Sequence, residues 1–478
     1  MRSDDLPIVL ERGGPEPLAV QVADALRAAA SSGALRVGDR LTSTRALASR
    51  LGVSRTVTAA AYDQLLAEGW LAGRRGSGTF VTAAPPASEA LGQPVHAETA
   101  GGPPSDADAA GTDQIDLTAG RPCLRVLDRS AWRRAWRTAS DRAPAGRPEH
   151  AGNAGFRRAV VEHLLRHRGL NARPDQVLAT SGTTSALAEL AGLLPRGAAV
   201  GLEEPGYQRA AEVMLAAGLR VVPVPVDGKG LRVDALPDGL AAVYCTPAHQ
   251  FPLGSRLSAQ RRVQLVERAR ARGMLIVEDD YDGELRYDVA PLPLLAALGP
   301  DVVVHLGTSS KLLTPTLGVG WLVAPPACQA RLLAARRRGA IRPAPAGQLV
   351  FAALAEYGDL ARHLRRLRRE LSERRQLVVE LLSRAGVPVL GDAAGAHLRV
   401  SLPDAEAERT VVERARRAGV LAPALADYHL GMPATFGISV GYAAPSRDDL
   451  RRAGAVLAAA VHVVGERAGQ PAIGGEVG

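Results

Sequence analysis

The two lysines of the chain are the first residues to consider for chemistry. Lys229 and Lys311 are its only lysines, although Lys and Arg together number 58. Arginine keeps its proton at any working pH, whereas a lysine removed from water can lose its proton and attack a carbonyl. Lys229 lies in a Gly-containing turn sequence, residues 227–230, where an exposed charge is expected. Lys311 ends the hydroxyl-rich stretch 307–311 after an apolar run, which suits a Schiff-base lysine beside an anion site.

Polar groups that can serve a cofactor follow other apolar runs. Residues 180–184, Thr-Ser-Gly-Thr-Thr, open a helical stretch, so hydroxyls and free N–H groups form an anion site there. Residues 278–282, Glu-Asp-Asp-Tyr-Asp, offer a carboxylate that can pair with a protonated ring nitrogen. Residues 246–252 supply imidazole and amide groups, and residues 203–209 supply a phenol and a guanidinium. Taken singly, the Ser-Gly-Thr and acidic motifs also fit ordinary helix caps.

The region from about 115 to 464 alternates strand-like runs with helical stretches. This alternation predicts an α/β layered domain with a largely parallel sheet. The strand-like runs are 176–180, 198–202, 241–245, 274–278 and 302–306. In such sheets the ligand site lies at the carboxyl ends of the strands, where the candidate groups occur. Amine, anion site, ring carboxylate and phenol are together the groups of a pyridoxal-phosphate pocket.

The first 82 residues predict a smaller α+β domain. Apolar residues have helical spacing over 18–30, and two further helices, the second capped by Ser54, follow up to residue 68. Two short strands, 70–72 and 79–81, enclose a turn rich in Gly and Arg. This order predicts a winged helix-turn-helix, whose wing can approach a phosphate backbone closely.

Composition sets the boundaries and the general class. Residues 83–114 are rich in Ala, Pro, Gly and acids and contain no Lys or Arg, so we expect a flexible linker, and residues 466–478 are expected to be a disordered tail. The three cysteines lack ligand spacing, which fits reduced thiols and argues against a metal site. We find no signal sequence and no apolar span of about 18 residues, so we expect a soluble cytoplasmic protein without membrane contact.

The net charge of +9 is compatible with nucleic-acid binding but does not locate it. The densest arginine run, 362–375, also contains Glu370 and Glu373 and has helical apolar spacing. A solvated helix face therefore explains this run better than a DNA contact.

Residues 17–82 resemble the GntR-type winged helix almost end to end, through the segments 38–47, 51–55 and 75–81. Thr42 departs from the family, which usually has proline there. The resemblance implies binding to double-stranded operator DNA, with a winged helix used for protein contacts as the alternative. The residues expected to meet DNA are Ser43, Thr44, Arg45, Ser54, Arg55, Thr56, Arg74, Arg75 and Gly76.

The strand-end groups of residues 115–465 resemble those of the class I/II aminotransferase-like domain, fold type I, with its smaller C-terminal α+β subdomain. Joined to the N-terminal module, the chain resembles MocR-type regulators, related to the GabR and PdxR groups. The resemblance implies a homodimer that binds pyridoxal 5'-phosphate: Lys311 forms the internal aldimine, Asp279 pairs with the pyridine nitrogen, and Tyr281 approaches the ring oxygen. The other residues expected to bind the cofactor are Gly182, Thr183, Thr184, Tyr207, His249, Gln250 and Thr308.

Three departures from the family pattern bear on the ligand. Gly318 stands where an arginine usually contacts the phosphate region. Arg147 replaces a tyrosine that reaches across the dimer, and we hypothesise that Arg147 of the partner subunit takes the place of the missing arginine. Residues 435–442 lack the arginine that commonly holds a substrate carboxylate; Arg399 can serve instead or be a surface strand residue. The residues expected to face an amino-acid ligand are Tyr207, Arg209 and Arg399.

The leading interpretation is a DNA-binding transcription regulator that senses pyridoxal phosphate, or an amine or amino acid that condenses with it. Regulation then requires only differential binding of the ligand, and no turnover. An active aminotransferase with an appended DNA-binding domain is one alternative, and a residual half-reaction of transamination is left open. A degenerate regulator that no longer binds the cofactor is the other.

Overall fold

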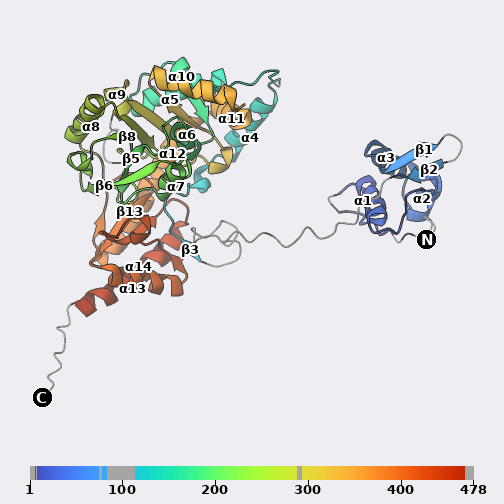
Figure 1. Cartoon of the computed structure of the whole chain (residues 1–478). Helices are drawn as coiled ribbons and strands as arrows, with labels where there is room; N and C mark the ends of the chain where they lie inside the picture. Colours follow the sequence, from blue (N-terminus) through green and yellow to red (C-terminus); the bar gives the residue numbers. More distant parts are fainter. Residues whose placement is uncertain are drawn as a thin grey trace. The chain divides into compact units, whose positions relative to one another are not determined.

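The computed structural model describes residues 6, 8–14, 16–74, 78–82, 114–143, 145–287 and 293–468. The chain divides into two compact units, residues 1–111 and 112–478 (Figure 1). The predicted linker lies almost wholly outside the described residues. Among those that are described, no helix combines the length and the apolar character needed to span a bilayer.

The first unit is the predicted winged helix. Its elements are α1 (Leu18–Ser31), α2 (Thr44–Leu51), α3 (Arg55–Ala67), β1 (Leu71–Arg74) and β2 (Gly78–Val81). The Ser43 and Ser54 side chains accept hydrogen bonds from the first turns of α2 and α3, which satisfies amide groups that a helix start leaves free. Strands β1 and β2 pair antiparallel, and leucines from all three helices and from β1 fill the core.

A mixed sheet forms the centre of the second unit. Its strand order is β4-β11-β10-β9-β8-β5-β6-β7. The strands from β10 to β6 run parallel, whereas β11 is antiparallel to both β10 and β4, and β7 is antiparallel to β6. The bounds are β4 (Val177–Thr180), β5 (Ala199–Glu204), β6 (Arg220–Asp227), β7 (Gly230–Leu231), β8 (Leu240–Cys245), β9 (Leu275–Asp280), β10 (Val303–Thr308) and β11 (Gly320–Val323).

Helices cover both faces of this sheet. Successive residues of a strand point to opposite faces, so they belong to two different apolar cores, one on each side of the sheet. On β4, Val177 and Ala179 belong to one apolar cluster and Leu178 to the other. The first cluster is completed by α4 (Arg129–Ser140), α5 (Ala154–Arg168), α8 (Ala259–Arg272), α9 (Leu295–Leu298), α11 (Pro345–Glu356) and α12 (Asp359–Arg384). The second is completed by α6 (Thr183–Ala191), α7 (Gln208–Ala216) and α10 (Pro326–Arg338). The predicted α/β layered fold is confirmed.

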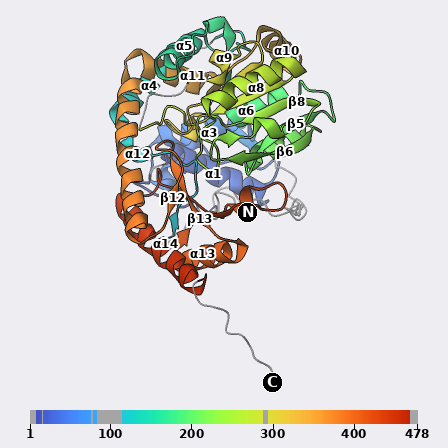
Figure 2. The same cartoon turned by 90° about the vertical axis from the view of Figure 1, so that its left-hand side faces the viewer.

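The C-terminal subdomain is a small antiparallel sheet with two helices. Its sheet has the order β12 (Val389–Leu390), β13 (His397–Leu402), β15 (Phe436–Gly441), and its helices are α13 (Ala405–Arg417) and α14 (Arg447–Ala468). Strand β14 (Val420–Leu421) pairs in parallel with β3 (Ile115–Asp116), which ties the start of the unit to this subdomain. Helix α12 packs against α11 at one end and α14 at the other (Figure 2).

Short 3-10 turns connect several elements: η2 (Leu124–Val126), η3 (Pro174–Gln176), η4 (Val233–Ala235), η5 (Pro315–Leu317) and η6 (Ala426–Tyr428). Because α14 continues to Ala468, the first three residues of the predicted tail are helical, and the remaining tail residues lie outside the described part of the chain.

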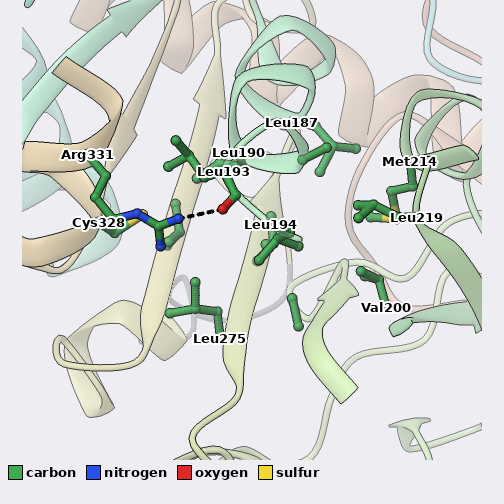
Figure 3. Close-up of a pocket in the computed structure, with 14 residues that line it drawn as sticks. Leu187, Leu190, Leu193, Leu194, Val200, Met214, Leu219, Leu275, Cys328 and Arg331 are labelled. Atoms are coloured by element: carbon green, nitrogen blue, oxygen red, sulfur yellow. Dashed lines mark hydrogen bonds between the residues drawn. The ribbon is translucent and has the colours of Figure 1, made fainter. Parts of the chain in front are cut away.

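The core between the sheet and helices α6, α7 and α10 contains a void of about 30 Å³ (Figure 3). Its walls are almost wholly apolar, and the Arg331 guanidinium at its edge donates a hydrogen bond to the Leu193 carbonyl. A space of this volume holds about one water molecule and is too small for a ligand.

Candidate functional site

A cavity of about 560 Å³ lies at the carboxyl ends of strands β8, β9 and β10, beside the start of α6. This is the edge of a parallel sheet where ligand sites are expected. The cavity is lined by Ala119, Gly120, Ser181, Gly182, Thr183, Thr184, Ser185, Ala188, Tyr207, Val213, Tyr244, Thr246, Phe251, Asp279, Tyr281, Thr308, Ser310, Lys311 and Pro315. Its volume is in the range of small-molecule and cofactor sites.

Lys311 follows β10 by three residues and reaches across to the segment after β3. Its Nζ donates a hydrogen bond to the carbonyl of Gly120 at 2.5 Å. A Cβ at Gly120 would lie 3.1 Å from Nζ, and the residue has a φ of +86°, so both packing and backbone favour glycine there. Burial lowers the pKa of Lys311, which favours the neutral amine that can attack a carbonyl.

Asp279 lies near the end of β9 and is buried, with 4% of its surface exposed. Burial raises its pKa to about 6, against the opposing effect of a 2.5 Å hydrogen bond that Tyr244 Oη donates to Oδ2. The second oxygen, Oδ1, is buried and has no hydrogen-bond partner among the described residues. An unpartnered buried acceptor that lines a cavity fits the N–H of a protonated ring nitrogen.

The start of α6 also lines the cavity, through Gly182 to Ser185. Gly182 is the N-cap of this helix, with a φ of +143° and no side-chain cap, so the amides of the first turn have no helical acceptors. The hydroxyls of Thr308 and Ser310, which hydrogen bond to each other at 2.9 Å, also line the cavity. These groups suit a phosphate. Among the described lining residues, Lys311 is the only cationic side chain.

Tyr207 and Tyr281 line the cavity together with Phe251. The Phe251 ring makes edge contacts to both, at centroid distances of 5.9 Å to Tyr207 and 6.2 Å to Tyr281. His249 and Gln250 do not line the cavity. The Gln250 amide instead donates to Glu203 and to the carbonyls of Pro205 and Phe251, and His249 Nδ1 lies 3.0 Å from Asp282 Oδ2.

The three arginines considered for the ligand also lie outside the cavity lining. Arg147 is exposed, and Arg209 is exposed and pairs with Glu212 on its own helix at 3.4 Å. Arg399 is partly buried on β13, directly opposite Ser439 on β15. Gly318 adopts a left-handed φ of +61°, and a Cβ there would meet no atom of the described residues within 4 Å.

Most predicted DNA-contacting residues are exposed on the first unit. Arg45 and Arg55 lie in the first turns of α2 and α3, and Thr56 is exposed beside Arg55. Ser43 and Ser54 act as helix caps, and Thr44 is partly buried. The Arg74 side chain, Arg75 and Gly76 lie outside what the structure describes.

Several residues that line the cavity have no role predicted from the sequence, among them Gly120, Tyr244, Phe251 and Ser310. Tyr244 is the next-to-last residue of the predicted strand 241–245, Phe251 follows His249 and Gln250, and Ser310 precedes Lys311. Position near a strand end is therefore a usable signal for these three residues. Gly120 has no such signal, because its segment is held by distant parts of the chain, through the pairing of β3 with β14 and a hydrogen bond from the Gly441 amide to the Leu117 carbonyl.

The folds and the site together define a winged-helix DNA-binding domain joined to an aminotransferase-like domain with a pyridoxal-phosphate pocket. A model of "Bacterial regulatory proteins, gntR family" matches residues 18–81, and one of "Aminotransferase class I and II" matches residues 112–457. The chain therefore belongs to the aminotransferase class I and II family, and with its GntR domain it is a MocR-type transcriptional regulator.

The chain is similar both to transcriptional regulators and, in its fold, to aminotransferases. The pyridoxine biosynthesis regulator PdxR of Corynebacterium glutamicum is 38% identical over 450 residues, which cover 94% of this chain and 96% of that protein. The probable rhizopine catabolism regulatory protein MocR of Rhizobium meliloti is 33% identical, with 79% of each chain covered. The fold of the multiple substrate aminotransferase from Thermococcus profundus matches with a TM-score of 0.69 at 23% identity, over 76% of this chain and 96% of that one.

The residues present fit the cofactor of this family. Pyridoxal phosphate supplies an aldehyde and an electron-withdrawing ring when bound. Lys311 is placed to bind the aldehyde carbon as an amine, and Asp279 Oδ1 to hold the proton on the ring nitrogen. The amides at the start of α6 would hold the phosphate, and the rings of Phe251 and Tyr207 line the same cavity.

Proposed function

We propose that this regulator senses pyridoxal phosphate itself, bound at Lys311 in the cytoplasm, and that occupancy changes how a homodimer engages operator DNA. The observation that carries the proposal is the charge of the cavity. Among its described lining residues, only Asp279 and Lys311 are charged, and the chemistry of the cofactor occupies both. No lining cation remains for the carboxylate of an amino acid. The name of the PdxR relative, which refers to pyridoxine biosynthesis, supports the same ligand class.

Dimerisation is part of the proposal. Among the described residues that line the cavity, the phosphate site of one chain has amides and hydroxyls but no arginine, and Gly318 stands at the family's arginine position. Arg147 is exposed and carries no resolved ion pair among the described residues, so it is available to a second subunit. We assign the missing phosphate contact to Arg147 of the partner subunit.

The test is titration of the purified protein with pyridoxal phosphate, followed by its absorption spectrum and by binding to the DNA upstream of its own gene. Wild type should develop a visible band, and the affinity for DNA should change with the cofactor. Lys311→Ala should lose both effects, whereas Lys229→Ala removes the other, exposed lysine and should keep them. A colourless wild type would identify a degenerate receptor, and keto-acid-dependent turnover would identify a working aminotransferase.

A second candidate ligand, an amino acid, is favoured by one observation at Arg399. No hydrogen bond or ion pair of this guanidinium occurs among the described residues, and burial alone lowers its pKa. Ser439 Oγ, directly across the strand pair, is buried and also has no partner in the described structure. A partly buried guanidinium that has no protein partner among the described residues, beside a buried hydroxyl, suits a carboxylate. If Arg399 binds an effector, Arg399→Gln should abolish an amino-acid effect on DNA binding and leave cofactor binding intact.

A further inference from the structure

A cluster of three buried side chains lies behind the cavity tyrosine Tyr281. His249, Asp282 and His397 are each 2% exposed. His249 and Asp282 follow neighbouring strands of the large sheet, whereas His397 begins β13 of the C-terminal subdomain. The two imidazole rings lie 4.6 Å apart between centroids. The cluster is therefore a contact between the C-terminal subdomain and the layer that forms the ligand cavity.

The hydrogen bonds fix the orientation of His249. Its Nδ1 lies 3.0 Å from Asp282 Oδ2 and 3.2 Å from Tyr281 Oη. The Tyr281 hydroxyl donates its own proton to the carbonyl of His249 at 2.9 Å, so its oxygen can only accept from the imidazole. We assign the proton of His249 to Nδ1, between these two oxygen acceptors. The ring thereby restrains the hydroxyl of Tyr281, which lines the cavity, whereas His249 itself does not.

His397 is held by separate contacts. Its ring donates to the Pro252 carbonyl, and its Nε2 is buried without a partner in the described structure. Burial, and then the neighbouring His249, hold the pKa of His397 well below its usual range, so the ring is neutral at physiological pH. A neutral ring next to His249 acts by packing and not by charge. Its position follows the subdomain to which it belongs.

Gly395 shows how closely the C-terminal subdomain packs against His249 and Asp282. A Cβ at Gly395, two residues before His397, would lie 2.1 Å from His249 Cε1 and 2.6 Å from Asp282 Oδ2. The Gly395 amide donates to the Leu285 carbonyl at 2.6 Å, and Tyr442 Oη donates to the Gly395 carbonyl at 2.9 Å. The segment before β13 is thus packed directly onto the pair that holds Tyr281.

We propose that His397 is a positioning residue that couples the C-terminal subdomain to the ligand cavity. Its ring fixes the plane of His249, His249 fixes the Tyr281 hydroxyl through Nδ1–H, and Tyr281 contacts the bound ligand. A displacement of the subdomain removes His397 from His249 and releases the tyrosine. In the opposite direction, a ligand that holds Tyr281 stabilises the packed position of the subdomain. The inference rests on the proposed function in one respect, that the ligand is pyridoxal phosphate.

The test is a double-mutant cycle between His397→Phe and Tyr281→Phe, read by the dissociation constant and the absorption maximum of bound pyridoxal phosphate. Loss of one ordered hydrogen bond is typically worth about 1 kcal/mol, or about fivefold. His397→Phe should therefore weaken binding about three- to tenfold and shift the absorption maximum, but only when Tyr281 is present. The same effect in both backgrounds, or no effect in either, would overturn the proposal.

Matched variants separate this role from folding. His163→Phe removes another buried histidine, which pairs with Glu284 at 2.8 Å and has no described contact with Tyr281, so it should leave the absorption maximum unchanged. If His397→Phe does not fold, His397→Gln keeps a donor for Pro252 but lacks the ring, and the same cycle applies. Absence of a visible band in the wild type would refute the proposed function. A visible band with additive effects of the two substitutions would refute only the coupling between His397 and Tyr281.

Discussion

Replacing Tyr244 by phenylalanine should make binding of the cofactor depend on pH in a defined way. The Tyr244 hydroxyl donates to Asp279 Oδ2 at 2.5 Å and opposes the effect of burial, which raises the pKa of Asp279 to about 6. A hydrogen bond to a charged group contributes about 1.5–3 kcal/mol, or about one to two pKa units. In Tyr244→Phe the pKa of Asp279 should accordingly rise to about 7–8.

The magnitude follows from the fraction of Asp279 that is ionised. At pH 7, a carboxyl with a pKa of about 6 is about nine-tenths ionised, whereas one with a pKa of about 7–8 is between about half and one-tenth ionised. Since only the carboxylate accepts the ring N–H, the affinity of Tyr244→Phe for pyridoxal phosphate at pH 7 should fall about two- to tenfold. The loss should shrink as the pH rises above 8 and grow as it falls toward 6.

The assay is a titration of pyridoxal phosphate, followed by absorbance, at several pH values between 6 and 9 for wild type and variant. Tyr62→Phe, which removes a buried tyrosine hydroxyl from the DNA-binding domain, serves as the control and should leave the curves unchanged. An affinity loss of equal size at every pH would mean that Tyr244 acts by packing alone. No loss at any pH would refute the role assigned to Asp279.

Two further predictions concern the dimer and acid stability. Arg147→Ala should weaken binding of pyridoxal phosphate by about tenfold or more, as expected for loss of a charge-assisted phosphate contact. The control Arg142→Ala, which changes an exposed arginine nearby, should leave the affinity unchanged. Equal affinity of Arg147→Ala and wild type would exclude the contact. Hydrogen bonds from Arg447 and then Arg374 lower the pKa of Glu370 to about 2, so its stabilising contribution is present above pH 4.5 and is lost as pH falls toward 2. Glu370→Gln should therefore melt below wild type at pH 6, with the difference in melting temperature disappearing near pH 2; a constant difference would contradict the assignment.

Sequence periodicity predicted the elements well because burial on two faces leaves a strong pattern. The predicted strands 274–278 and 302–306 correspond to Leu275–Asp280 and Val303–Thr308. Both real strands extend two residues further, through Asp279 and Asp280 in β9 and through Gly307 and Thr308 in β10, which are not apolar residues. The backbone ladder continues there regardless of side-chain polarity, so hydrophobic pattern alone ends each strand too early.

Part of the candidate site could be predicted from the positions of residues at strand ends. Position at the carboxyl end of a strand is enough to place Lys311, Asp279 and Tyr281 around one cavity, as the structure does. It does not give the direction of side chains in the irregular segment after β8. There Phe251 enters the cavity, while His249 and Gln250 point to buried partners.

Arg209 shows a second limit of sequence reasoning. Its place one residue into α7 directs it to Glu212 one turn later and not toward the ligand. The contact of His397 with His249 joins residues far apart in the chain, and no local pattern indicates it.

The length of α12 determines how far a small rotation of this helix displaces the C-terminal subdomain. At 1.5 Å per residue, its 26 residues form a rod of about 39 Å, packed against α11 near its start and against α14 farther along. A tilt of about 5° at the start carries the far end by about 3 Å, as much as the length of a hydrogen bond. A small angular change where α12 packs against α11 thus becomes a displacement of about the length of a hydrogen bond where it packs against α14.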